Sequence, residues 1–167
     1  MDEQARRQLG ALSGLHEEFE RDGIDYRLFG GWAVDFHVGS VTRPHDDLDL
    51  AVWFEDLPRI EERLAAGGWR HAPLKDEDGG TGYERGGVRL ELTYLVRDGE
   101  GAVCIPLRAG LARWSDGPLG GVLMERFGVR ARVVDLAVLR RDKSRGRSEP
   151  EDAAKDSADF DALLRIS

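Results

Sequence analysis

Apolar residues recur every three or four positions in the first part of the chain, at Ala5, Leu9, Leu12, Leu15 and Phe19. Charged residues fill the positions between them, a pattern typical of an amphipathic helix with one buried face. Asp2 is suited to cap the start of this helix, and Gly23 follows its last turn. His16 falls on the polar face, so we expect it at the surface.

Beyond this helix, the hydrophobic pattern switches between period two and the helical period. Alternating runs predict strands at residues 26–29, 47–53, 69–74, 81–85, 88–96, 122–127 and 129–134. Helical spacing, with Pro and Gly at the expected ends, predicts helices at residues 32–37, 56–66, 136–142 and 151–164. The Gly-rich stretch between Asp98 and Gly121 has no clear period, and we expect a short strand around Val103 and a mobile loop around Trp114.

This order of elements predicts a mixed β-sheet with flanking helices, an α+β domain with a small helical part at its C-terminal end. A chain of 167 residues is the size of one domain. We expect residues 1–134 to form the main domain and residues 135–167 a helical extension of it.

Composition narrows the class of protein. Hydrophobic residues make up 41% and charged residues 34%, as in globular proteins. No apolar run is long enough to span a bilayer, and the N-terminus lacks a secretory apolar core, so we expect a cytoplasmic protein. A single cysteine, Cys104, rules out an internal disulfide framework and is expected to be a small buried hydrophobe. The net charge of −8 argues against nucleic acid as a partner and suits a cationic small molecule.

Carboxylates are the candidate chemistry. Asp47 and Asp49 are two apart on a predicted strand, which places both on one face about 6–7 Å apart. Glu91 is flanked by leucines in a later strand and needs a partner there. Oxygen ligands of this kind suit Mg²⁺, and two ions could hold the attacking and leaving oxygens of a phosphoryl-type transfer. The alternative is structural: the aspartates mark an exposed strand face, and Glu91 pairs with Arg89.

A glycine pair precedes the acids. Gly30 and Gly31 follow a strand and open a helix, where backbone N–H groups can approach a phosphate. Such a pair is also common in simple turns. Arg43 and His45 lie in the loop before Asp47, where they either contact phosphate oxygens or are solvated.

The string GGWAVDFHVGSVTRPHDDLDL, followed by a later acid at Glu91, resembles the polymerase-β-type nucleotidyltransferase superfamily. Within it, the chain is most similar to aminoglycoside 2''-adenylyltransferases and lincosamide nucleotidyltransferases. The similarity is dense over residues 30–52. It is loose in the C-terminal half, where Lys143 and the run from Lys155 to Asp159 are similar to the ending of the family. These last two residues are also spaced as a surface pair on a helix.

The resemblance implies a polymerase-β-like nucleotidyltransferase fold with its catalytic domain in residues 1–134. It implies that Asp47 and Asp49 hold Mg²⁺, two ions in all. Glu91 would complete the metal site or act as general base, although relatives more often have Asp there. Residues that would bind the nucleotide are Gly30, Gly31, Arg43, His45 and Lys143.

The activity implied is transfer of AMP from Mg-ATP to a hydroxyl of an aminoglycoside or lincosamide-like antibiotic, which confers resistance. Tyr94 or Trp114 would line the acceptor pocket by stacking on a sugar face, whereas Trp32 and Trp69 are expected in the core. Because the chain is short, we expect a homodimer in which a second subunit completes the cleft. Two other classes remain open: a same-fold enzyme acting on a protein or tRNA, and a non-catalytic binding protein.

Overall fold

The computed structural model describes residues 1–115, 119–144 and 150–166. Its helices are α1 (Glu3–Asp22), α2 (Gly30–Val38), α3 (Leu57–Ala66), α4 (Leu136–Ser144) and α5 (Pro150–Leu164), with a 3-10 turn η1 (Phe54–Asp56). Its strands are β1 (Tyr26–Phe29), β2 (Leu48–Trp53), β3 (Arg70–His71), β4 (Gly80–Arg85), β5 (Val88–Arg97), β6 (Val103–Leu107), β7 (Gly110–Ser115), β8 (Val122–Arg126) and β9 (Val129–Val133).

The sheet is mixed, as predicted. Its main path has the order β3-β4-β5-β2-β1-β9-β8, and β6 and β7 form a hairpin that continues from the end of β5. β2 runs parallel to β5 and β1 runs parallel to β9, whereas the other neighbours are antiparallel. The parallel pair β2–β5 lies in the middle of the path and carries the candidate acids.

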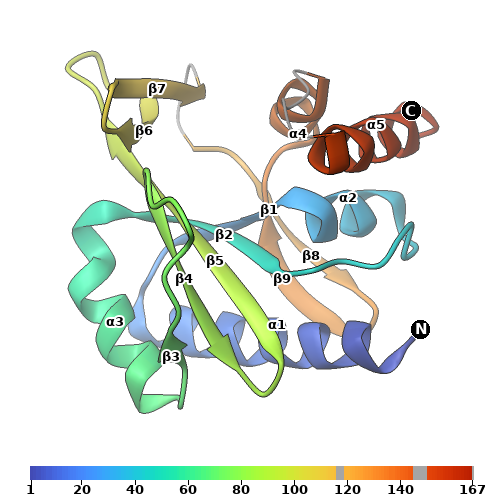
Figure 1. Ribbon diagram of the computed structural model, residues 1–167, viewed down its shortest axis with the longest axis horizontal. Coiled ribbons are helices and arrows are strands. Elements are labelled where there is room, and N and C mark those ends of the chain that lie inside the picture. Colours follow the sequence, from blue (N-terminus) through green and yellow to red (C-terminus); the bar gives the residue numbers. More distant parts are fainter. Residues whose placement is uncertain (116–118, 145–149, 167) are drawn as a thin grey trace.

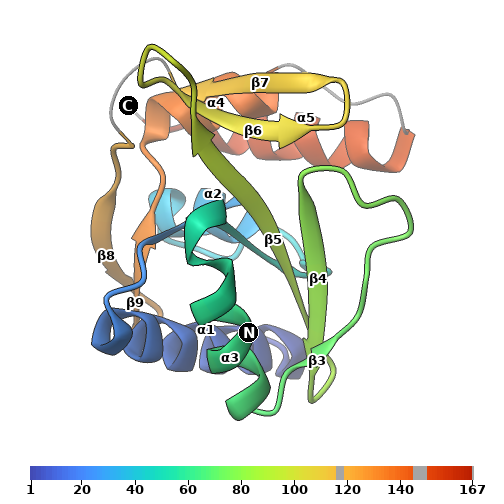
Figure 2. The same ribbon diagram turned by 90° about the vertical axis from the view of Figure 1, so that its left-hand side faces the viewer.

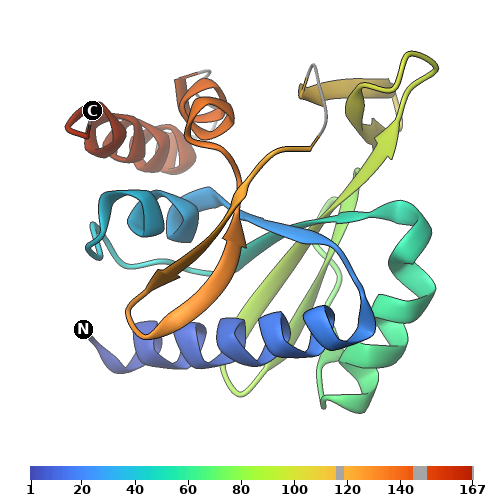
Figure 3. The ribbon, with the colours of Figure 1, turned by 180° about the vertical axis from the view of Figure 1, so that it is seen from behind.

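Helices cover both faces of this sheet. Figure 1 shows α1 and α3 on one face and α2, α4 and α5 on the other. The β6–β7 hairpin projects from the end of β5 on the same side as α4 and α5 (Figures 1 and 2). Seen from behind, α5 lies over α2, and β8 is the exposed edge strand (Figure 3). The candidate site therefore lies on the face that α2 and the C-terminal helices share.

The N-terminal helix forms as predicted. The carboxylate of Asp2 accepts a hydrogen bond from the backbone N–H of Ala5, and Gly23 ends the helix with a φ of 68°. Its apolar face is fully buried at Leu12 and Phe19. The central strands are covered on both faces, because Ala51 is as buried as its neighbour Leu50. The aspartate face of β2 is therefore buried at Ala51 and half-buried at Asp49, and it is not an exposed strand face.

Two local predictions are wrong. The strand predicted at residues 69–74 shrinks to β3, because Pro73 has no N–H to donate to a ladder. Trp114 lies in β7 and is buried, whereas a mobile loop was expected there. This Gly-rich stretch is ordered because β7 pairs with β6. Such pairing did not show as a regular spacing of apolar residues in the sequence. Trp32, Trp69 and Cys104 are buried, as expected.

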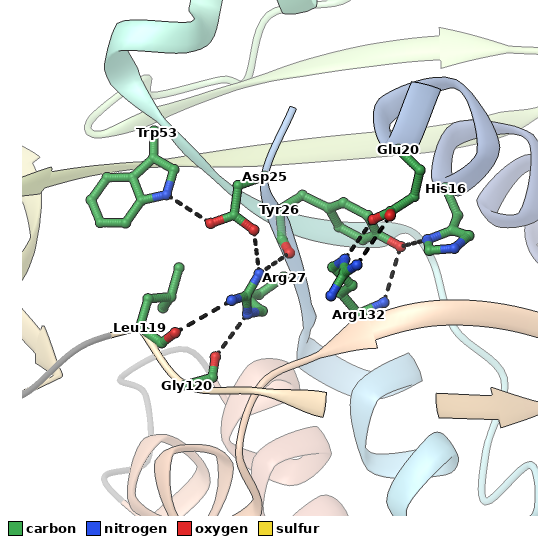
Figure 4. A network of polar contacts seen from close by, with 9 residues as sticks. All are labelled: His16, Glu20, Asp25, Tyr26, Arg27, Trp53, Leu119, Gly120 and Arg132. Atoms are coloured by element: carbon green, nitrogen blue, oxygen red, sulfur yellow. Dashed lines mark hydrogen bonds and ion pairs between the residues drawn. The ribbon is translucent and has the colours of Figure 1, made fainter. Parts of the chain in front are cut away.

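The prediction for His16 is also wrong, because this residue is buried and not at the surface. Its Nδ1 lies 2.7 Å from the hydroxyl of Tyr26, which also accepts a hydrogen bond from the backbone N–H of Arg132 (Figure 4). In the same view, Arg27 of β1 donates to the backbone carbonyls of Leu119 and Gly120. These contacts fasten α1 and the entry to β8 onto the central strands.

The expected domain boundary at residue 134 falls between β9 and α4. The two helices that follow pack against α2, so the C-terminal extension joins the site face of the sheet. Among the helices of the described segments, none combines the length and apolar character needed to cross a bilayer.

Candidate active site

Three carboxylates meet on the face of the sheet that α2, α4 and α5 cover. Asp49 of β2 and Glu91 of β5 are direct partners in the parallel register, and Asp47 lies one residue before β2. One carboxylate oxygen of each residue lies within 4.8 Å of those of the other two, and all three residues are half-buried. Like charges held this close are costly unless a cation lies between them. The donor set is all oxygen and matches the ligands that Mg²⁺ prefers, so these residues fit a divalent cation.

The glycine at the start of α2 lets this helix approach the acids. Gly30 has a φ of 70°, a left-handed conformation that favours glycine, and a Cβ built there would overlap the carboxylate of Asp49. Phe29 precedes the helix and makes no side-chain capping bond. The positive end of the α2 dipole therefore faces Asp49, where it favours negative charge.

The second glycine makes room for two other predicted site residues. A Cβ on Gly31 would lie only 2.6 Å from Cε1 of His45 and 2.8 Å from a terminal nitrogen of Arg43. Both side chains therefore lie against the first turn of α2. The structure brings Gly30, Gly31, Arg43 and His45 together with the acids, around the start of this helix.

His45 is engaged with a buried carboxylate. Its Nε2 lies 2.5 Å from Oδ2 of Asp35, which is fully buried and also accepts from the N–H and hydroxyl of Thr42. Its carbonyl accepts a hydrogen bond of 2.8 Å from the side-chain amide of Gln8. Nδ1 of His45 is buried, and no hydrogen-bond partner for it lies in the described part of the chain. His45 thus anchors its loop to α1 and α2, and a phosphate contact remains a prediction.

Arg43 is likewise engaged. Its Nε and one terminal nitrogen each donate to a carboxylate oxygen of Asp159 in α5, both at 2.8 Å, and Asp159 is fully buried. One turn earlier in α5, Lys155 lies 2.5 Å from the carboxylate of Asp46. Lys155 and Asp159 are therefore more than a surface pair, because the helix face that they share meets the loop before Asp47.

The two candidate acceptor residues lie in different places. Tyr94 is three residues beyond Glu91 in β5, so strand alternation puts it on the opposite face. There it contacts the ring of Phe54, and burial, reinforced by nearby Glu77 and Glu61, raises its pKa. Tyr94 is therefore not brought to the acids, contrary to expectation.

Trp114 does lie next to the site. It makes an edge-to-face contact with Phe29, with ring centroids 5.9 Å apart. Phe29 is the partner of Asp49 in the β1–β2 register. The β6–β7 hairpin thus places an indole beside Phe29 of β1, the strand next to β2 and Asp49. The side chain of the other C-terminal candidate, Lys143 in α4, lies outside the described part of the structure.

Sequence reasoning missed three residues that hold the site, Gln8, Asp35 and Asp159. Asp35 gave a usable signal, because a carboxylate within the apolar run from Trp32 to Phe36 needs buried partners. Asp159 gave only the loose similarity of the run that it ends, and Gln8 gave no signal, because their partners come from distant parts of the chain.

Comparison with known families agrees with this arrangement. The sequence profile of the aminoglycoside-2''-adenylyltransferase family matches residues 11–101, more than half of the chain. The chain belongs to this family. The match spans the glycine pair, the loop, both aspartates and Glu91, so the resemblance to nucleotidyltransferases is confirmed. No curated protein sequence matches the chain.

Solved structures show the same fold as this family member. ANT(2'')-Ia in complex with adenylyl-2''-tobramycin has a TM-score of 0.75 at 20% identity, covering 95% of this chain and 88% of that one. The lincosamide antibiotic adenylyltransferase LnuA, lincomycin-bound, has a TM-score of 0.70 at 15% identity, covering 92% and 94%. A nucleotidyltransferase-like protein from Paracoccidioides brasiliensis has a TM-score of 0.56 at 16% identity, covering 96% and 77%. These structures confirm the polymerase-β-like nucleotidyltransferase fold, and membership of the family confirms the enzyme class.

Proposed function

We propose that this protein transfers AMP from Mg-ATP to a hydroxyl of a small cationic antibiotic, an aminoglycoside or a lincosamide. The observation that carries the proposal is the cluster of Asp47, Asp49 and Glu91 at the start of α2. Membership of the adenylyltransferase family supports the donor, and the net charge of −8 supports a cationic acceptor.

In this proposal, Asp47 and Asp49 hold the magnesium, as two ions, and Glu91 either completes this site or takes a proton from the acceptor. When bound, the metal neutralises the charge that develops on the phosphate oxygens. The acceptor hydroxyl oxygen bonds to the α-phosphorus, the bond from that phosphorus to the bridging oxygen breaks, and pyrophosphate leaves. The hydroxyl proton passes to Glu91 as general base.

The protein's own part is to bind and orient the reactants. Backbone N–H groups of Gly30 and Gly31 in the uncapped first turn of α2 are suited to hold the triphosphate. Trp114, which is 8% exposed and packs next to Phe29, is the candidate for the wall of the acceptor pocket. Arg43, His45 and Lys143 remain candidates for the nucleotide site.

We further propose that the enzyme acts in the cytoplasm as a homodimer. Val122 and Leu123 of the edge strand β8 are about half exposed, at 48% and 51%, and a second subunit could cover them.

The test is a screen for pyrophosphate release with ATP, Mg²⁺ and a panel of aminoglycosides and lincosamides. Release that depends on one antibiotic, together with a mass increase of that antibiotic by one AMP, is expected. The absence of release with every antibiotic would overturn the proposed acceptor class. Binding of Mg-ATP without turnover would favour one of the two other classes, an enzyme with a protein or tRNA acceptor or a non-catalytic binding protein.

A further inference from the structure

The loop that leads from α2 to Asp47 has no regular secondary structure over residues 40–47. Side chains hold it instead. Asp35 binds Thr42 and His45, and Gln8 binds the carbonyl of His45. These contacts fasten the inner side of the loop to α1 and α2.

The outer side of the loop is held by α5. Arg43 pairs with Asp159, and Asp46, the residue directly before Asp47, pairs with Lys155. Lys155 and Asp159 are four residues apart, so they lie on one face of α5. That face spans the segment of the loop that ends at Asp47.

The two pairs differ in strength. Arg43 and Asp159 form a bidentate pair with 18% and 0% of their side chains exposed, and such pairs fix geometry as well as charge. Asp46 is 72% exposed, and exposed pairs contribute little. Arg43 and Asp159 therefore dominate the contact between α5 and the loop.

We propose that Arg43 and Asp159 form a positioning pair that holds Asp47 in place for metal binding, so that α5 belongs to the working site. This inference rests on the proposed function, because it takes Asp47 as a metal ligand. It gives Arg43 a role through the loop that does not depend on the phosphate contact expected from sequence. Removing partners that orient metal ligands typically weakens metal affinity 10- to 100-fold.

The test measures Mn²⁺ binding in the absence of nucleotide, by the paramagnetic signal of free Mn²⁺. Carboxylate sites for Mg²⁺ also accept Mn²⁺. The double variant R43Q/D159N removes the charges of both members of the pair and keeps the side chains close to their original size. The matched control is D22N/R63Q, which removes a bidentate pair between α1 and α3 on the other face of the sheet. In that pair, Nε and a terminal nitrogen of Arg63 donate to the two carboxylate oxygens of Asp22, at 2.5 and 2.8 Å.

We expect R43Q/D159N to bind Mn²⁺ about tenfold more weakly than the unmodified protein, with the control unchanged. Circular dichroism establishes that each variant is folded. If the double variant does not fold, R43K replaces it, because lysine keeps the charge but lacks the planar fork. Unchanged Mn²⁺ affinity in the folded variant would overturn the positioning pair alone. Failure of the unmodified protein to bind Mn²⁺ would overturn the metal site, and the pair with it.

Discussion

Asp49 and Glu91 lie side by side as register partners on the parallel strands β2 and β5. Phe29 continues this row on β1, and Gly82 continues it on β4. A Cβ on Gly82 would come within 2.8 Å of the guanidinium of Arg89, so the glycine leaves room for that side chain. Asp49 and Glu91 therefore lie in a single row across four strands, and Asp47 lies two residues before Asp49.

The metal assignment predicts a large effect of D49N. The change keeps the size of the side chain but removes a charged ligand. Turnover should fall at least about 100-fold, about 3 kcal/mol of transition-state stabilisation, and ATP binding should become insensitive to EDTA. Titration calorimetry with and without EDTA measures the binding, and E55Q at an exposed position controls for the loss of charge. ATP binding that ignores EDTA in the unmodified protein, with an active D49N, would show that the acids hold no metal.

The role of Glu91 is separated by E91Q. If Glu91 is the general base, the variant should lose acceptor-dependent turnover and still bind Mg-ATP nearly as well. If it is a metal ligand, binding of Mg²⁺ and nucleotide should weaken together. We favour the base, because the longer arm of Glu reaches further toward an acceptor hydroxyl. Full activity of E91Q at saturating substrates would leave only a structural role, as partner of Arg89, whose Nε lies 3.2 Å from its carboxylate.

The two aromatic candidates should behave differently. W114L removes the ring that lies against Phe29, and it should raise KM for the acceptor about tenfold, about 1.4 kcal/mol, without changing KM for ATP. Y94L, on the opposite face of β5, is the matched control and should leave both constants unchanged. Steady-state kinetics with each substrate varied in turn decide the matter. Equal effects of the two changes would refute an acceptor role for Trp114.

The burial of His16 predicts that the free energy of unfolding falls at acidic pH. Burial lowers its pKa below the ordinary 6.5, with Glu20 opposing this shift. The folded state therefore prefers the neutral imidazole, and its contribution to stability is complete above pH 6.5 and lost as the pH falls below that value. H16Q should show a smaller fall in the free energy of unfolding between about pH 7 and pH 5, measured with urea. H71Q, at an exposed histidine, is the control, and the same fall in all three proteins would contradict the argument.

The assembly prediction is checked by light scattering at micromolar concentration. A homodimer should have twice the chain mass of 18.6 kDa. A charge on the exposed apolar pair of β8, as in L123E, should shift the mass toward the monomer if that edge is the interface. A mass of 18.6 kDa for the unmodified protein would contradict the dimer.

Much of this architecture could be predicted from local sequence signals. The apolar period from Ala5 to Phe19 gave α1, and the alternation around Asp47 and Asp49 gave β2, because each pattern depends only on neighbours a few residues apart. The same alternation could have excluded Tyr94, which is an odd number of residues from Glu91.

What could not be predicted depends on partners in other helices, strands and loops. His16 lies on the polar face of α1 by its position in the sequence, and its partner, the Tyr26 hydroxyl, belongs to the next element, β1. From sequence alone, Lys155 and Asp159 are spaced as a surface pair on a helix. Their partners in the loop, Asp46 and Arg43, lie 109 and 116 residues earlier in the chain. No local period reports such contacts, because they exist only after the sheet has formed.

The span between Arg43 and Asp159 also has a consequence for biosynthesis. A ribosome releases the N-terminal part of a chain first, and that part begins to fold while the rest is being made. The carboxylates of Asp47 and Asp49 thus emerge early, whereas their loop meets its α5 partners only after residue 159 has been translated. A nascent chain therefore carries the metal ligands before it carries the helix that fixes them, and the mature geometry arises at the end of translation.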